Sequence, residues 1–395
     1  MPHRPLVRLP VPPGPAGVAA VRAALPGALD GTGPALAPVP VVSATVSSAY
    51  VDSVLRALRP EDPHRPLEHD DVAVVVATSG STGDPKGVLL TASALAFTAR
   101  GPSVSSPAAW LAALPVTSVG GLQVVVRALL AGTPLQALPS LGGAEPFTAS
   151  AFAAAVDRLA AEADGLPLRT SLVPAQLSRL LADPAATAAL CRLDRLLLGG
   201  AAAPRALLVA ARDAGVAVTT TYGMTETAGG CVYDGVPFPG VDVALDAGEV
   251  LLGGPMVARG YRDRAEETAR AFAGGRYRTG DLGVLTADGR LAVDGRVDDV
   301  VQVRGVNVAL GAVERVLLEA PGWTDAAVVA VPDEADGSRL VAYVAGDLSG
   351  GEDAALRRVR DRLGPAAVPR EVCAVGSLPL LASGKIDRAA LRRRS

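Results

Sequence analysis

Apolar residues follow two recurring patterns along the chain up to about Pro237. Short β-branched runs such as Val72–Ala77 are typical of buried strands, and segments such as 152–163 carry apolar residues at helical spacing with charges opposite. Strands that alternate with helices favour a layered α/β domain with a largely parallel sheet. The same patterns predict helices over 16–28, 48–58, 91–100, 120–131 and 176–182, and strands over 108–114, 170–173 and Arg195–Leu198.

Beyond Pro237 the pattern changes to short alternating strands punctuated by glycine, which favours a small antiparallel or β-barrel-like part over about 237–294. A polar, Asp-rich connector at 294–299 and a compact α+β region follow. We therefore expect a large domain over 1–294, a hinge at 295–299 and a small domain over 300–395. The strands expected here are 241–245, Glu249–Gly253, 283–286, 290–293, 325–331 and 339–346, with helices over 311–319 and Glu352–Leu363 and a terminal loop and helix.

Composition narrows the class of protein. A chain of 395 residues, 49% hydrophobic and 19% charged, fits two or three globular domains. No apolar run approaches the ~20 residues of a membrane span, and the first residues lack the apolar core of a signal peptide. We therefore expect a cytoplasmic protein without a membrane span. A net charge of −3 argues against a general nucleic-acid binder.

Scarce residue types are more informative. The three histidines, His3, His64 and His69, all precede the first motif, which disfavours a Ser-His-Asp or Cys-His mechanism. The three cysteines are far apart and odd in number, so neither a disulfide framework nor a zinc site is indicated. Of the 37 basic side chains all but two are arginine, and Lys86 and Lys385 both lie in glycine-flanked segments. An ammonium enters phosphate or carboxylate sites that a planar guanidinium does not fit, so both lysines are functional candidates.

The segment 78–87, which follows the predicted strand Val72–Ala77, has the composition of an anion-binding loop. Glycines let the backbone approach an anion and point successive N–H groups at it, while hydroxyls and one ammonium add donors and charge. Gly87 follows the lysine where the common G-x-x-x-x-G-K-[ST] loop has Ser or Thr, so that motif is excluded. The predicted phosphate contacts are Thr78, Ser79, Gly80, Ser81, Thr82, Gly83 and Lys86.

This loop resembles the signature loop of the adenylate-forming superfamily, which comprises acyl- and aryl-CoA ligases, peptide-synthetase adenylation domains and luciferases. Segments 222–227, 277–281, 295–299 and 379–387 match further motifs of that family in the same order, and 199–204 resembles its adenine-side loop. Each match alone has an ordinary reading as a turn, a helix start or a solvated connector; the shared order favours the family. The resemblance implies that the ATP site also includes Gly200, Ala201, Tyr222, Gly223, Met224, Asp281 and Arg296, with the tyrosine at the adenine and the aspartate at the ribose.

The resemblance also implies a reaction. A carboxylate attacks the α-phosphate of ATP to give an acyl-adenylate and pyrophosphate, and coenzyme A then displaces AMP. Because two anions must meet, catalysis rests mainly on positioning and electrostatic stabilisation. The family motifs imply Thr225 at the α-phosphate, Glu226 at Mg²⁺ and Lys385 between the carboxylate and the α-phosphate. The small, mobile C-terminal domain would then rotate about Asp298, withdraw that lysine and present Arg304 and Gly305 for thiol attack.

Two segments, 114–122 and 221–240, resemble a branch of aryl-CoA ligases that serves menaquinone biosynthesis. That resemblance implies an acid with an aromatic ring and a second polar or anionic group. Relatives often carry histidine where this chain has Val116, Thr117 and Ser118, so either small hydroxyls bind the second group or the acid differs. The candidate acid-pocket residues are Thr117, Ser118, Gly121, Leu122 and Gly229.

Other functions stay open at this point. Another acyl- or aryl-CoA ligase, or a stand-alone adenylation enzyme that loads a carrier protein, would use the same ATP site. A nucleotide-binding pseudoenzyme or regulatory module would keep the site without the chemistry. ATP, Mg²⁺ and coenzyme A are the expected cofactors, a small carboxylic acid is the expected partner, and a homodimer is one option for the oligomeric state.

Overall fold

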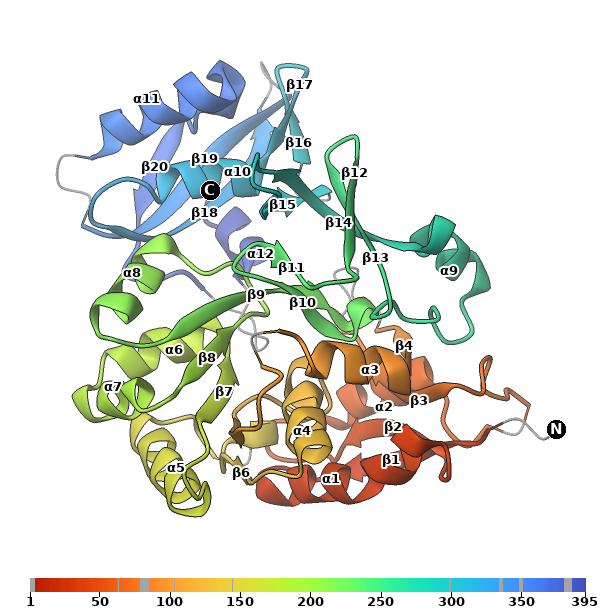
Figure 1. The fold of residues 1–395 in the computed structure, drawn as a ribbon. Helices are drawn as coiled ribbons and strands as arrows, with labels where there is room; N and C mark the ends of the chain where they lie inside the picture. The colour runs from red at the N-terminus through yellow and green to blue at the C-terminus, as the bar shows by residue number, and fades with distance from the viewer. Residues whose placement is uncertain are drawn as a thin grey trace. The chain divides into compact units, whose positions relative to one another are not determined.

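The computed structural model describes residues 4–62, 64–78, 85–102, 104–143, 145–297, 300–333, 337–347, 351–379 and 386–395 (Figure 1). The chain divides into two compact units. Unit 1 comprises Met1–Gly200, Ala214–Val243 and Leu251–Arg278, and unit 2 comprises Ala201–Asp213, Ala244–Val250 and Thr279–Ser395. The division at 295–299 that the motifs indicate stays a prediction.

The first sheet of unit 1 leads into the predicted phosphate loop. In sheet order its strands are β1 (Leu6–Val11), β2 (Ala35–Pro40), β3 (Val72–Ala77) and β4 (Gly87–Thr91). The helices of this region are α1 (Pro15–Asp30), α2 (Ser48–Leu58) and α3 (Ala92–Ala99). Pairing is parallel up to β3 and antiparallel between β3 and β4, where Ala77 lies opposite Gly87. The predicted loop is therefore the connection of an antiparallel strand pair.

The sequence pattern does not predict strands β1 and β2, because both contain proline. Proline lacks the N–H that a ladder needs and is normally confined to edge strands, strand starts and bulges. β1 is an edge strand, and β2 pairs with β3 at Leu36↔Val74, so Pro38 lies beyond that pairing. In contrast, β3 and α2 have the bounds that the sequence predicts.

The second sheet of unit 1 is the largely parallel sheet that the sequence predicts. In sheet order its strands are β11 (Val236–Pro237), β10 (Gly229–Tyr233), β9 (Val218–Met224), β8 (Arg195–Leu198), β7 (Leu168–Leu172), β5 (Ala109–Ala112) and β6 (Leu135–Ala137). Pairing is parallel from β9 to β6, whereas β10 and β11 run antiparallel. The helices here are α4 (Val119–Ala131), α5 (Ala149–Glu162), α6 (Pro174–Leu181) and α7 (Pro184–Cys191). Residues 222–224 thus end β9 at its carboxyl end, where open α/β sheets place ligands.

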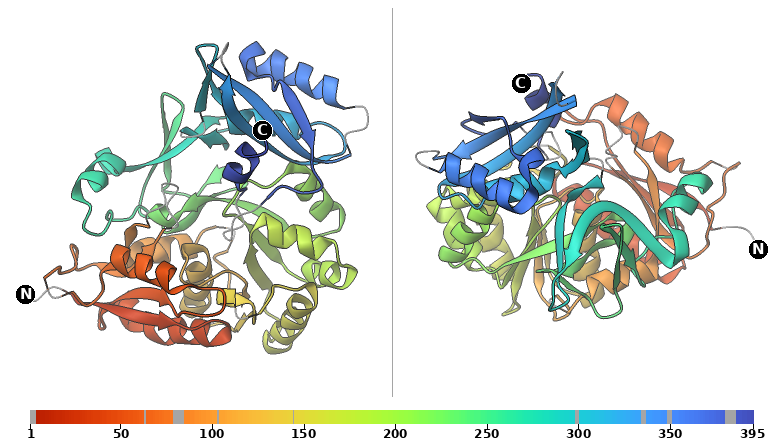
Figure 2. Two further views of the ribbon diagram at one scale, coloured as in Figure 1. Left: turned by 180° about the vertical axis from the view of Figure 1, so that it is seen from behind. Right: turned by 90° about the horizontal axis from the view of Figure 1, so that it is seen from above.

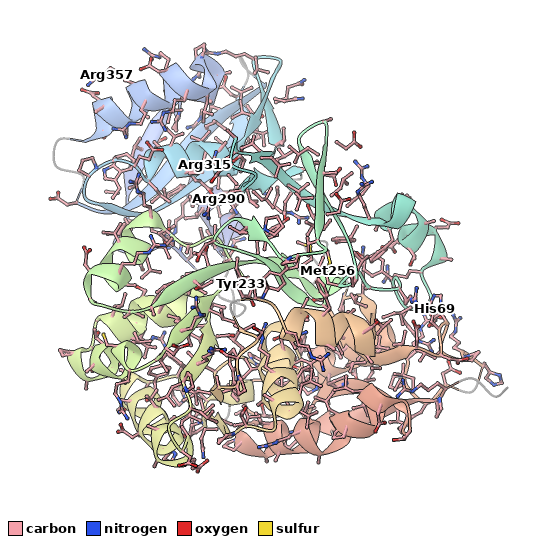
Figure 3. All side chains as sticks on the ribbon, viewed as in Figure 1. His69, Tyr233, Met256, Arg290, Arg315 and Arg357 are labelled. Carbon is pink, nitrogen blue, oxygen red and sulfur yellow. The ribbon has the colours of Figure 1, made fainter. Side chains whose placement is uncertain are left out.

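The strands predicted over about 237–294 form an open sheet, not a closed barrel, within the ranges that the structure describes. In sheet order they are β12 (Asp242–Asp246), β13 (Glu249–Gly253), β14 (Arg276–Leu285) and β15 (Leu291–Arg296), and helix α9 (Ala265–Ala271) precedes β14 in the chain. Residues 294–296 are strand, which corrects the connector predicted there. Side-chain partners explain the difference: Arg315, labelled in Figure 3, donates to Val293 O at 3.2 Å and to Asp294 Oδ1 at 2.6 Å.

The C-terminal part of unit 2 is a compact α+β fold, as predicted, with a sheet buried on both faces. The elements of unit 2 outside the sheet just described are α8 (Arg205–Asp213), β16 (Val300–Val303), β17 (Val306–Ala309), α10 (Leu310–Leu317), β18 (Trp323–Asp333), β19 (Gly337–Gly346), α11 (Glu352–Leu363), β20 (Glu371–Ala374) and α12 (Arg388–Arg392). Alternate residues of β18 point to opposite faces. Val328 joins a core with α10 and α11, whereas Val329 joins a second core with Leu391 of α12. Figure 2 shows α11 and α12 on opposite sides of this sheet.

Across the described ranges, every helix is too short or too polar to cross a lipid bilayer.

Helix α4 begins close against the segment before it, and Gly121 permits that approach. A Cβ at Gly121 would lie 2.3 Å from the carbonyl oxygen of Pro115 and 2.4 Å from that of Leu114. A Cβ at Gly120 would meet only the Leu114 side chain, at 3.2 Å. Gly132 ends the helix in the left-handed conformation with φ 65°, as the sequence predicts. The start of α4 is therefore held by a backbone contact that tolerates no side chain.

We expect Gly121→Ala to lower the free energy of unfolding by about 1–3 kcal/mol, because the added methyl group overlaps two carbonyl oxygens. Gly120→Ala is the matched control, and it should be neutral or stabilising by up to ~1 kcal/mol, since alanine favours a helix over glycine. Urea unfolding followed by circular dichroism measures both. Equal losses in the two variants would contradict the backbone contact.

Candidate functional site

The two ends of the predicted phosphate loop are tied together. Thr78 N donates to Lys86 O at 2.8 Å, and Lys86 N donates to Thr78 Oγ1 at 3.3 Å. Gly87 leaves no room for a side chain, because a Cβ there would lie 2.8 Å from Ala57 O. Lys86 is thus fixed at the point where the chain enters β4. The remaining predicted loop contacts, Ser79, Gly80, Ser81, Thr82 and Gly83, lie outside the described residues.

The Lys86 side chain lies between an aromatic ring and a carboxylate. Its Nζ is 2.6 Å from Glu267 Oε2 and 4.8 Å from the centroid of the Tyr261 ring. The other carboxylate oxygen of Glu267 is 2.5 Å from Arg264 Nη1. Hydrogen bonds from Lys86 and then from Arg264 lower the pKa of Glu267. The lysine is therefore paired with an ionised carboxylate.

Glu226, the predicted Mg²⁺ ligand, is a buried carboxyl surrounded by donors. Tyr261 Oη donates to Glu226 Oε1 at 2.9 Å, Tyr277 also hydrogen-bonds to the carboxyl, and Ala258 N donates to Glu226 O at 2.9 Å. Burial raises the pKa of Glu226, while a backbone hydrogen bond, the two tyrosine hydroxyls and the Lys86 charge oppose that rise. Mg²⁺ is usually held by one or two carboxylates together with phosphate and water oxygens. A single buried carboxylate beside a phosphate-loop lysine fits such a site.

The end of β9 and the start of β10 approach each other without side chains. A Cβ at Gly223 would lie 2.2 Å from Gly229 O, and Gly223 has a φ of 153°. Gly229 faces helix α4, because its Cβ would lie 3.1 Å from Gln123 Cγ and 3.9 Å from Val119 Cγ2. The structure thus brings the predicted acid-pocket residue Gly229 to the first turns of α4. The predicted nucleotide contacts Tyr222, Gly223, Met224 and Thr225 lie half-buried where β9 meets the single turn η2 (Thr225–Thr227).

A buried glutamine, Gln123, hydrogen-bonds to the backbone between β9 and β10. Gln123 Nε2 donates to Ala228 O at 2.7 Å and to Thr98 Oγ1 at 2.6 Å, and Thr98 Oγ1 donates to the same Ala228 O at 2.9 Å. Helices α3 and α4 therefore hold the residue that follows η2. The sequence pattern shows Gln123 only as a polar residue in an apolar helix, so its role was not predictable from spacing.

The other predicted acid-pocket residues differ in what they offer a ligand. Thr117 is half-buried, whereas Ser118 is exposed and its hydroxyl donates to Pro115 O at 2.7 Å. Leu122 is fully buried, and Gly121 packs against the preceding carbonyls. Of the hydroxyls, Thr117 is the one without a backbone acceptor among the described contacts. These five positions remain predictions, with Thr117 the strongest polar candidate.

In unit 2, the pairing of β14 with β15 places Asp281 opposite Arg296. Arg296 Nη1 lies 3.0 Å from Asp281 Oδ1 and 3.0 Å from Thr279 O, so the predicted ribose ligand is buried and ion-paired. Arg304 and Gly305 form the left-handed turn between β16 and β17, with φ 52° and 75°. The remaining predicted residues are placed as follows: Gly200 in unit 1 with φ 79°, Ala201 exposed in unit 2, and Asp298 and Lys385 outside the described residues.

Segment 260–276 is the part of the site that sequence reasoning missed; Tyr277, which follows it, begins the predicted motif 277–281. Tyr261 N donates to Thr268 Oγ1 at 2.9 Å, and the Phe272 ring packs against Tyr261 at 5.3 Å and Tyr277 at 5.0 Å. A signal existed: the chain holds only two Trp, six Tyr and five Phe residues, and three of these aromatics lie within 261–277. Such clustering indicates a built aromatic site when aromatic residues are otherwise scarce.

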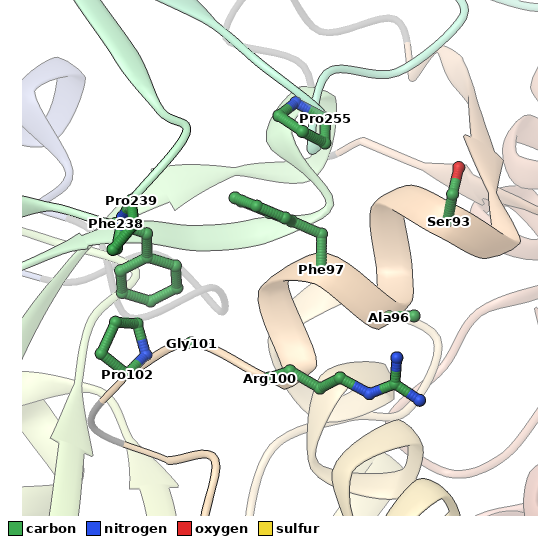
Figure 4. A pocket seen from close by; sticks show the side chains of 9 residues that line it. All are labelled: Ser93, Ala96, Phe97, Arg100, Gly101, Pro102, Phe238, Pro239 and Pro255. Atoms are coloured by element: carbon green, nitrogen blue, oxygen red, sulfur yellow. The ribbon is translucent and has the colours of Figure 1, made fainter.

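A pocket of about 470 Å³ lies elsewhere in unit 1 (Figure 4). Its walls include the Phe97 and Phe238 rings, and Phe238 covers Gly101 so closely that a Cβ there would lie 2.2 Å from the ring. It contains none of the predicted site residues. The lining residues are Ser93, Ala96, Phe97, Arg100, Gly101, Pro102, Phe238, Pro239 and Pro255.

The family model described as AMP-binding enzyme matches residues 32–262, and that of the AMP-binding enzyme C-terminal domain matches residues 312–385. The first match covers more than half of the chain, and both lie in the order that the motifs predict. This chain therefore belongs to the AMP-binding enzyme family, which confirms the resemblance to adenylate-forming enzymes.

Relatives and solved structures agree with this assignment. A probable 2-succinylbenzoate–CoA ligase of Mycobacterium tuberculosis is 42% identical over 383 residues, 94% of each chain. The 2-succinylbenzoate–CoA ligase of Geobacillus kaustophilus is 32% identical over 93% of this chain and 76% of its own. The structure of an amide bond synthetase from Marinactinospora thermotolerans has a TM-score of 0.76 at 26% identity, covering 100% of this chain and 90% of that one. An o-succinylbenzoate CoA synthetase from Bacillus subtilis, solved with its acyl-adenylate intermediate, has a TM-score of 0.70 at 23% identity and 99% and 89% coverage, which shows the fold alone.

We expect Tyr261→Phe to lower the free energy of unfolding by about 1–3 kcal/mol, because Glu226 loses a hydrogen-bond donor inside the protein. Tyr50→Phe is the control, since Tyr50 is 51% exposed and should tolerate the change. Denaturant unfolding of both variants and the parent measures the effect. A Tyr261→Phe variant as stable as the parent would contradict the importance of this hydrogen bond.

Proposed function

We propose that this chain is an AMP-forming acid–CoA ligase that converts 2-succinylbenzoate to its CoA thioester. The observation that carries the proposal is the match, at 42% identity over 94% of both chains, to a relative named as a probable ligase for that acid. The segments 114–122 and 221–240 resemble the same branch of menaquinone-pathway ligases. The cytoplasm is the expected compartment for the reaction, and a homodimer is one option for the assembly.

In the first half-reaction, the acid attacks the α-phosphate of ATP. Tyr222 and Asp281 take the adenine and ribose, and Lys86 meets the polyphosphate at the exit of its loop. Glu226 would hold Mg²⁺, which when bound neutralises polyphosphate charge. The carboxyl of Glu226 and its tyrosine donors are buried away from bulk water, and electrostatic interactions are stronger in such a water-excluded site. Thr225 contacts the α-phosphate, and Lys385 brings the acid carboxylate to it.

In the second half-reaction, the sulfur of coenzyme A attacks the acyl carbon and loses its proton to solvent. The bond between the acyl carbon and the phosphate oxygen breaks, and AMP leaves with that oxygen. The Arg304–Gly305 turn contributes to this step, after the small domain has rotated about Asp298. Thr117 is our candidate for the second carboxylate of the acid, because it is half-buried and small. Val116, Thr117 and Ser118 stand where relatives often carry histidine, which keeps another aromatic acid as the second candidate.

An acid panel tests the proposal. With ATP, Mg²⁺ and coenzyme A, we expect AMP release to be fastest with 2-succinylbenzoate. It should be slower by at least about tenfold with 4-oxo-4-phenylbutanoate, the same acid without the carboxylate on the ring, because the ~1.4 kcal/mol or more that this carboxylate contributes is lost. Thr117→Val should narrow that gap, because it removes the hydroxyl and keeps the size of the side chain. A different preferred acid would overturn the substrate. Failure of every acid to release pyrophosphate would favour a nucleotide-binding protein without the chemistry, and transfer only to a carrier protein would exclude the CoA step.

Separate half-reactions test the role of Lys385. Lys385→Ala should reduce adenylate formation by at least about a hundredfold, the scale of losing one group that stabilises transition-state charge. It should still convert supplied acyl-AMP to the thioester. Lys385→Arg is the control for charge, and we expect it to rescue poorly because a guanidinium does not replace a compact ammonium. Loss of both half-reactions in the alanine variant would contradict the separation of roles.

A further inference from the structure

Lys86 has an anionic partner within the protein. Its Nζ lies 2.6 Å from Glu267 Oε2, and its side chain is 26% exposed. The proposed function places the ATP polyphosphate at the same ammonium. A lysine that is half-buried beside a phosphate loop would otherwise be an uncompensated charge. Glu267 is therefore the anion that a phosphate oxygen would have to replace at this ammonium.

Glu267 also has a second cation in place. Arg264 Nη1 lies 2.5 Å from Glu267 Oε1, so each carboxylate oxygen has its own partner. If Lys86 turns toward another anion, Glu267 keeps the Arg264 ion pair and is not left unpaired. The lysine can turn because its ammonium is a compact charge with three donors on a flexible four-carbon stem. The ammonium also lies 4.8 Å from the centroid of the Tyr261 ring.

We propose that Glu267 is a positioning residue that holds Lys86 in the nucleotide-free enzyme and yields it to the polyphosphate of ATP, while Arg264 retains Glu267. The inference rests on the proposed function, which supplies the ATP. Polyphosphate carries several negative charges and attracts the ammonium more strongly than one carboxylate does. Glu267 and ATP therefore compete for Lys86, and Arg264 weakens Glu267 as a competitor by sharing its charge.

Competition predicts the sign of the effect. Glu267→Gln removes the competitor, so ATP should bind more tightly. The ion pair that is lost is weak, because its side chains are 26% and 28% exposed. Its loss therefore corresponds to about a two- to five-fold decrease in the Kd of ATP. Arg264→Gln leaves Glu267 to Lys86 alone, so ATP should bind more weakly by a similar factor. In the double variant, Arg264→Gln should have no further effect, because the carboxylate through which it acts is gone.

The experiment is calorimetric titration of the full-length protein with ATP and Mg²⁺ in the absence of acid, with adenosine as the ligand that lacks phosphates. Glu266→Gln is the matched control: Glu266 is the exposed neighbour in α9, and the substitution makes the same change in net charge. We expect tighter ATP binding in Glu267→Gln only, and unchanged adenosine binding in all variants. Thermal unfolding checks that each variant is folded. If Glu267→Gln does not fold, the weaker ATP binding expected of Arg264→Gln still tests the proposal.

Unchanged or weaker ATP binding in Glu267→Gln would overturn the proposal, and so would equal tightening in Glu266→Gln, which would indicate a general field effect. These failures are distinguishable from failure of the proposed function. If the parent binds ATP and activates an acid but the variants show no such pattern, only the role of Glu267 fails. If the parent binds no ATP, the proposed function and this inference fail together.

Discussion

Burying a carboxyl group costs free energy unless hydrogen-bond donors or positive charges compensate it. In unit 1, residues from several segments compensate the buried carboxyl of Glu226. Tyr261 and Tyr277 turn their hydroxyls to it, and the charge of Lys86 adds to them. Phe272 packs against both tyrosine rings and keeps them in place. The exit of the phosphate loop, the nucleotide motif and the segment before β14 therefore depend on one buried acidic group, although they are far apart in sequence.

Much of the fold was predictable because local patterns agree with the final packing. The β-branched run of β3 and the amphipathic α11 have the bounds that the sequence predicts, since each element buries the face that its pattern marks. Strands β1 and β2 were not predictable, because both contain proline, which disfavours a strand in a sequence pattern. Whether a strand tolerates proline depends on its place in the sheet, which the pattern does not show. The pairing of β14 with β15 was also beyond reach, because register depends on contacts made by Arg315 and Arg296 rather than on periodicity.

The candidate site divides in the same way. Motif order singled out Lys86, Tyr222, Glu226 and Asp281 as candidate nucleotide contacts, which stay predictions. Glu267, in contrast, reads as an ordinary acid in the first turn of a short helix, and only the folded chain brings it to Lys86. Sequence reasoning finds the residues that contact a ligand more readily than those that hold these residues in place, since the latter are defined by tertiary contacts.

The sheet of β18, β19 and β20 has a further consequence. Its two cores draw every buried member from residues 303–391, so this stretch completes both of its apolar interiors by itself. A segment with its own closed interior can accept changes in the rest of the chain without repacking. It is therefore suited to exchange between relatives as one block.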